Sequence, residues 1–196
     1  MEFTQKQNIQ FIAVLLLLAV ITQATYTLLY MVASDAPRLW LWSIEGPMFL
    51  ILAAIAGSAL VGANKYTLGF SAIFVSAILN VVQVGVGLTQ FVPFREAAQA
   101  VEALAPATGA VFALSFFIYN GAKVLLGLSA VVFGIAATQG GLTWLGRLSV
   151  LVGVLAMVAN SIVMMFGRID AVPSGATGVL ATLLLALCLF KLKFDD

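Results

Sequence analysis

The hydrophobic positions of this chain fall into six long runs, and the short stretches between them carry most of its charges. A helix needs about 20 mainly apolar residues to cross the hydrocarbon core of a bilayer. The runs are close to this length or longer, and they predict membrane spans at residues 10–33, 46–63, 67–91, 108–138, 143–167 and 174–191. The fourth run is too long for an upright crossing, so we expect it to tilt or to project beyond the membrane.

Composition supports one membrane-embedded domain covering residues 1–196. The chain is 63% hydrophobic and 9% charged, whereas soluble domains carry about 25% charged residues. No hydrophilic segment is long enough to form a separate domain. The predicted fold is therefore an all-α integral membrane protein, a bundle of six transmembrane helices with membrane lipid around it. The net charge of +1 gives no basic patch for nucleic acid.

The positive charges predict the orientation, because Lys and Arg collect in cytoplasmic segments. If the N-terminus is cytoplasmic, that side holds Lys6, Lys65, Arg147, Lys191 and Lys193. The opposite side then holds Arg38, Arg95 and Arg168. This excess favours cytoplasmic N- and C-termini. The expected location is the cytoplasmic membrane of a bacterium.

Two local patterns refine the expected architecture. The sequence FREAAQAVEALAPA, between the third and fourth spans, predicts a short interfacial helix near Arg95–Leu104. Asn80 precedes Pro93 by 13 residues, and Asn160 precedes Pro173 by 13 residues. This spacing fits three repeated helical hairpins, although chance explains so few matching positions equally well.

Lys123 is the most informative single residue. It lies about 15 residues from either end of the fourth span, or roughly 22 Å along a helix, which is too far for its side chain to reach water. An ionisable residue in such a position is a functional-site hypothesis by default. Three states would offset the free-energy cost of burying such a lysine: a neutral amine, a charged amine held by amide oxygens and Tyr119, or a charged amine that contacts a bound anion.

Small and polar residues repeat at steps of three and four along spans 1, 3, 4 and 5. We therefore expect these four spans to face one another around a polar layer, with span 6 at the periphery. Glu45 is placed at the outer end of span 2, and no carboxylate is expected at the depth of the lysine. The candidate ligand-binding residues are Lys123, Asn120, Asn80, Gln83, Asn160, Gln23, Tyr26, Tyr119 and Glu45.

The residue inventory argues against an enzyme without deciding the question. The chain has no histidine and one cysteine, Cys188, so it has no Ser-His-Asp or Cys-His set. No carboxylate pair lies within the spans, and no glycine-rich loop has nucleotide-binding spacing. We expect no metal and no cofactor.

Two functions remain open. In the first, the protein binds or transports a small anionic or lipid-like ligand in an intramembrane polar pocket around Lys123. In the second, it is a non-catalytic structural or accessory subunit of a larger membrane complex, and its amides serve only helix packing. Either function is compatible with a homo-oligomer.

Overall fold

The computed structural model describes residues 3–33, 37–167, 169 and 171–192. Two residues of the charge count, Arg168 and Lys193, lie outside these ranges. In the described part of the chain, six α-helices are long and apolar enough to cross a membrane. They are α1 (Gln5–Val32), α2 (Leu39–Val61), α3 (Thr67–Ala100), α4 (Ala105–Gln139), α5 (Thr143–Phe166) and α6 (Ser174–Lys191). The prediction of an all-α chain with six membrane-length helices is confirmed.

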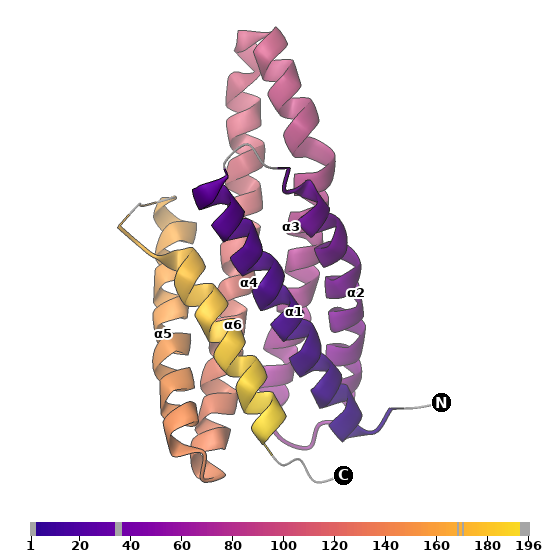
Figure 1. The fold of residues 1–196 in the computed structure, drawn as a ribbon, viewed down its shortest axis with the longest axis vertical. Coiled ribbons are helices and arrows are strands. Elements are labelled where there is room, and N and C mark those ends of the chain that lie inside the picture. The colour runs from indigo at the N-terminus through magenta and orange to yellow at the C-terminus, as the bar shows by residue number, and fades with distance from the viewer. Residues whose placement is uncertain (1–2, 34–36, 168, 170, 193–196) are drawn as a thin grey trace.

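The third and fourth helices form a hairpin that projects well beyond the others, at the end opposite both termini (Figure 1). The expected interfacial helix near Arg95–Leu104 does not form a separate element. Its first half is the continuation of α3 through Pro93 to Ala100, and only the 3-10 helix η1 (Glu102–Leu104) follows before α4. The strong helix formers after the proline extend α3, and the Thr108 hydroxyl donates to the Phe94 carbonyl at 2.8 Å across the hairpin.

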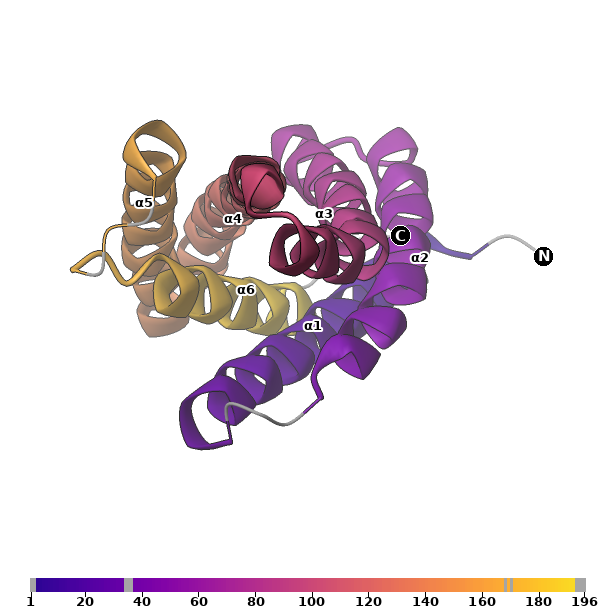
Figure 2. The ribbon, with the colours of Figure 1, turned by 90° about the horizontal axis from the view of Figure 1, so that it is seen from above.

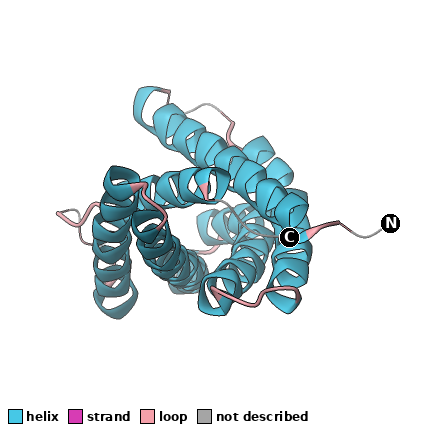
Figure 3. Cartoon of the chain, turned by 90° about the horizontal axis from the view of Figure 1, so that it is seen from below, coloured by secondary structure: helices cyan, strands magenta, loops and turns pink. Residues whose placement is uncertain are grey.

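The chain termini lie at the end of the bundle away from the hairpin (Figure 1), and this end faces the viewer in Figure 3. This placement agrees with an even number of crossings. Whether that end faces the cytoplasm stays a prediction from the charge pattern.

Five helices form a closed ring in which each packs on the next, in the order α1, α2, α3, α4, α6 and back to α1 (Figure 2). The remaining helix, α5, packs only on α4 and α6. The expectation of a peripheral sixth span is therefore wrong: α6 is part of the ring and α5 lies outside it. The buried face of α6 includes Gly178, Ala181 and Ala186, and small residues allow this close approach.

The polar stripe expected on the fifth span holds α5 against α4. A Cβ added to Gly153 would lie 2.7 Å from the Gly127 carbonyl oxygen, so the two backbones are in direct contact. The Ser149 hydroxyl donates to the Ala130 carbonyl at 2.8 Å. These contacts form a small-residue seam of the kind that joins membrane helices, and they do not face the interior of the ring.

Candidate functional site

Lys123 is enclosed on all sides by α1, α4 and α6. Its side chain is fully buried, and its Nζ donates to Oε1 of Gln23 at 2.5 Å. The amine also lies 5.2 Å from the centre of the Tyr119 ring. The alkyl stem rests on Gly178, where an added Cβ would lie 2.9 Å from Cδ of the lysine. The amine is therefore held by an amide oxygen and an aromatic face.

A buried carboxylate completes this cluster. Glu45 is 4% exposed and accepts a hydrogen bond from Thr22 Oγ1 at 2.6 Å. It is close enough to Lys123 to interact with it electrostatically. Glu45 lies within α2 (Leu39–Val61), so the expectation that no carboxylate lies within a span at the depth of the lysine is wrong.

The error comes from the start of the second span. The helix begins at Leu39 and continues through Pro47, so Glu45 lies inside it rather than at its end. Pro47 is the ninth residue of this helix, so it removes the intrahelical hydrogen bond to the Ser43 carbonyl, but it does not end the helix. The sequence signal for this longer helix was the apolar stretch from Leu39 to Trp42.

The cluster lies at one level in the bundle. Gln23, Glu45 and Lys123 are each about 16 to 18 residues from the helix end nearest the chain termini, or roughly 25 Å at helical rise. They therefore lie nearer the hairpin end of the ring than the terminal end.

A cavity of about 350 Å³ opens next to this cluster, inside the hairpin half of the ring. It is lined by Gln23, Tyr26, Thr27, Tyr30, Trp42, Glu45, Gln83, Phe91, Ser115, Phe116 and Tyr119. We call it the ring cavity. Five of the nine candidate residues are among its lining. Lys123 is not among them, because Gln23 and Tyr119 stand between its amine and the open space. The pocket is beside the lysine rather than around it.

Aromatic side chains form most of the ring cavity wall. The Tyr26 ring stacks on Trp42 with centroids 5.5 Å apart, and Phe91 meets the same indole edge-on at 5.5 Å. The Arg38 guanidinium lies over Tyr26 and Tyr30, at 5.4 and 5.2 Å from their ring centres. Sequence reasoning missed Trp42 and Tyr30 as lining residues, although the four-residue spacing of Tyr26 and Tyr30 places them on one helix face.

The three asparagines among the candidate residues are all buried. Asn80, Asn120 and Asn160 are 1%, 2% and 0% exposed. Each donates its Nδ2 to the carbonyl four residues earlier in its own helix, and each Oδ1 is buried without a hydrogen-bond partner. Asn160 also donates to the Ser174 carbonyl at 3.3 Å. In the described part of the chain, these bonds do not join the asparagines to one another or to Lys123.

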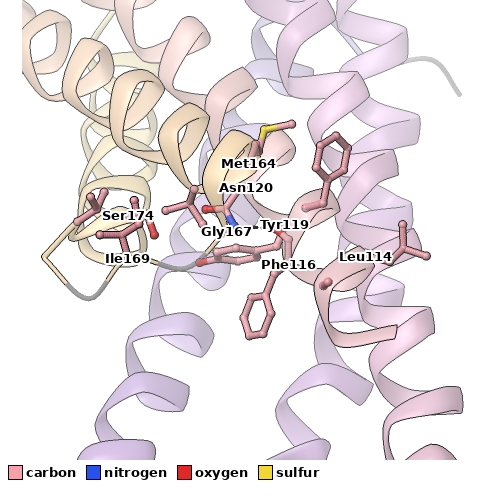
Figure 4. Close-up of a pocket in the computed structure, with 13 residues that line it drawn as sticks. Leu114, Phe116, Tyr119, Asn120, Met164, Gly167, Ile169 and Ser174 are labelled. Carbon is pink, nitrogen blue, oxygen red and sulfur yellow. Dashed lines mark hydrogen bonds between the residues drawn. The ribbon is translucent and has the colours of Figure 1, made fainter. Parts of the chain in front are cut away.

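Asn120 lines a second cavity, of about 820 Å³, between α4 and the facing ends of α5 and α6. Figure 4 shows Asn120 and Tyr119 extending from α4 toward the side where Ser174 and Ile169 lie. We call this space the lateral cavity. Tyr119 and Phe116 line both cavities and form the wall between them.

Six helices of the described chain are long and apolar enough to cross a membrane, and this composition is that of a multi-pass α-helical membrane protein. Comparisons with protein-family models, curated proteins and solved structures found no significant match to the chain. Within the described residues, no group of three or more His, Cys, Asp or Glu side chains is placed to hold a metal ion. The ring cavity and the lateral cavity are therefore the candidate ligand sites.

Proposed function

We propose that this protein binds a small, amphiphilic, lipid-like molecule in the ring cavity. The observation that carries the proposal is the cavity's composition, an aromatic wall above a floor that includes the buried Glu45 carboxylate. Ligand sites in proteins are typically apolar concavities with a few convergent polar groups. A space of about 350 Å³ is at the small end of this range.

The polar groups of the ring cavity favour a ligand head that donates hydrogen bonds. One oxygen of Glu45 is bonded to Thr22, and a carboxylate accepts more than one bond. Gln83 donates its Nε2 to Ser115 Oγ at 3.4 Å and so has an amide oxygen to offer, whereas Oε1 of Gln23 already accepts from Lys123. A hydroxyl or amine head would bond to these acceptors, while an apolar or planar body would lie against Trp42 and its aromatic neighbours.

An anionic ligand, which the lysine alone suggested, is less well supported. The amine of Lys123 is bonded to Gln23 and lies outside the cavity lining. Among the described residues, the lining contains one acid and no Lys or Arg. In this proposal Lys123 holds Gln23 in place and balances the charge of Glu45, so that the floor is polar without a net charge.

Native mass spectrometry of the protein from mild detergent tests this proposal. The wild-type protein should retain a small molecule. Ser115 lines the cavity and is 2% exposed, so the ring added by Ser115→Phe would fill the cavity and this variant should lose the molecule. The matched control is Leu155→Phe, on the exposed face of α5, which should retain the molecule. Equal occupancy in the two variants, or no bound molecule in the wild-type protein, would contradict the proposal. Uptake of the identified molecule into vesicles would then separate transport from binding.

The second function, an accessory subunit of a larger membrane complex, is favoured by the projecting hairpin. Its tip exposes Phe94, Val101 and Leu104 at 36%, 51% and 42%, beside the charged Arg95 and Glu102. An exposed apolar surface bordered by charged residues is suited to contact with another protein. If it makes such a contact, a Val101→Asp and Leu104→Asp double substitution should reduce the native size of the assembly extracted from its own membrane.

A further inference from the structure

The lateral cavity has polar groups that the ring cavity proposal does not use. Asn120 is 2% exposed and donates its Nδ2 to the Phe116 carbonyl at 2.6 Å. Its Oδ1 is buried and has no partner. A buried acceptor without a hydrogen bond costs about 1–3 kcal/mol, and such groups in native proteins call for an explanation. Of the three asparagines with this property, Asn120 is the one that lines a described cavity.

A second polar feature lies at the opposite wall. The cavity is bordered by Ser174 and Gly175, the first two residues of α6, whose N-terminus has no side-chain cap. The first N–H groups of a helix have no intrahelical acceptor, and they favour an oxygen with negative charge. The Ser174 N–H already donates to the Val172 carbonyl at 2.8 Å, so the Gly175 N–H is the donor that α6 offers to the cavity. The cavity therefore has an acceptor on one wall and a donor on the other. A head with both a hydroxyl and an anionic oxygen matches the two.

The position of the cavity indicates that such a head would belong to a lipid. α6 has 18 residues, or about 27 Å of helix, close to the thickness of the hydrocarbon core. Its N-terminus is therefore expected at the boundary where lipid heads lie. The rim residues Leu114 and Phe117 are each 52% exposed, so the cavity is continuous with the lipid-facing surface. Val163 and Met164 give it an apolar wall for an acyl chain.

We propose that the lateral cavity is a binding site for a membrane lipid with a glycerol-type head. The head hydroxyl donates to Oδ1 of Asn120, and an anionic oxygen of the phosphate accepts from the Gly175 N–H at the start of α6. The acyl chain lies against the apolar wall between α4 and α5. This site is separated from the ring cavity by Tyr119 and does not depend on the function proposed for that cavity.

Binding of two matched lipids to delipidated protein tests the site. Dioleoylphosphatidylglycerol carries the hydroxyls, and dioleoylphosphatidylmethanol has the same charge without them. In native mass spectrometry titrations, the wild-type protein should prefer the glycerol lipid by about five- to tenfold, because one hydrogen bond contributes on the order of 1 kcal/mol. Asn120→Leu should abolish this preference. Asn80→Leu should keep it, since Asn80 is equally buried and outside the cavity lining.

A second variant covers the case in which Asn120→Leu fails to fold. A Cβ at Gly175 would meet nothing within 4 Å, so Gly175→Leu extends into the cavity without a clash and should weaken binding of both lipids. Gly109→Leu, also in open space, is its control and should bind as the wild-type protein does. The proposal is overturned if the wild-type protein shows no preference for the glycerol lipid. It is equally overturned if the preference survives Asn120→Leu, if Gly175→Leu binds both lipids as tightly as the wild-type protein does, or if the preference is lost in Asn80→Leu.

Discussion

The electrostatic interaction between Lys123 and Glu45 predicts a specific pattern in a double-mutant cycle. Removing one of two opposite buried charges leaves the other less compensated, and for a buried ion pair this costs about 3–5 kcal/mol. Because Glu45 is also bonded to Thr22 and Lys123 to Gln23, we expect Glu45→Gln and Lys123→Met each to cost about 3 kcal/mol, at the lower end of that range. The double substitution leaves no uncompensated charge and should be more stable than either single variant.

Thermal unfolding in detergent, followed by intrinsic fluorescence, measures the cycle. For a chain of this size about 3 kcal/mol corresponds to a decrease of roughly 6–12 °C in melting temperature. Lys65→Met removes an exposed lysine and should stay within about 0.5 kcal/mol of the wild-type protein. If the two single effects simply add in the double variant, the residues are not coupled. If Lys123→Met is as stable as the wild-type protein, the lysine is uncharged and the account of the polar floor is wrong.

Two further predictions concern packing and orientation. Gly178→Ala should lower the melting temperature because the added Cβ would press on the alkyl stem of Lys123. Gly109 lies in a helix with open space around it, so Gly109→Ala should raise the free energy of unfolding by up to about 1 kcal/mol. Parallel thermal unfolding curves compare the two variants. In a Cys188→Ala background, cysteines introduced at Lys65 and Glu96 should react with a membrane-impermeant thiol reagent from opposite sides of the membrane, the first from the cytoplasm; labelling of both from one side would contradict the six-crossing arrangement.

The helices were predictable from sequence because hydropathy adds up over about 20 residues and tolerates individual exceptions. Which helices pack against one another was less predictable. Three-and-four stepping identifies the small or polar face of a helix, but it does not say which other helix that face meets. The faces of α5 and α6 both carry small residues, and only the packed structure shows that α6 closes the ring while α5 lies outside it.

The candidate site was predictable from the sequence only in part. Gln23, Gln83 and Tyr119 were found because amides and hydroxyls stand out in apolar helices, and the structure brings them to one cavity. Glu45 was assigned to the end of its span because the proline two residues later suggested a helix boundary. Trp42 was missed because an aromatic residue in a membrane helix is compatible with packing, with the interface and with a ligand wall.

The most direct test of the central claim is site-specific photo-crosslinking in living cells from the wall of the ring cavity. A benzophenone amino acid at Phe91, which lines the cavity, should give an adduct of one defined mass with a small amphiphile, visible in the intact protein by mass spectrometry. The same group at Leu155, on the lipid-facing side of α5, should give only the heterogeneous adducts of bulk lipid. A discrete mass at Phe91 that is absent at Leu155 and lost on Ser115→Phe is the predicted result. The same bulk-lipid adducts at both positions, or no adduct at Phe91, would contradict the account.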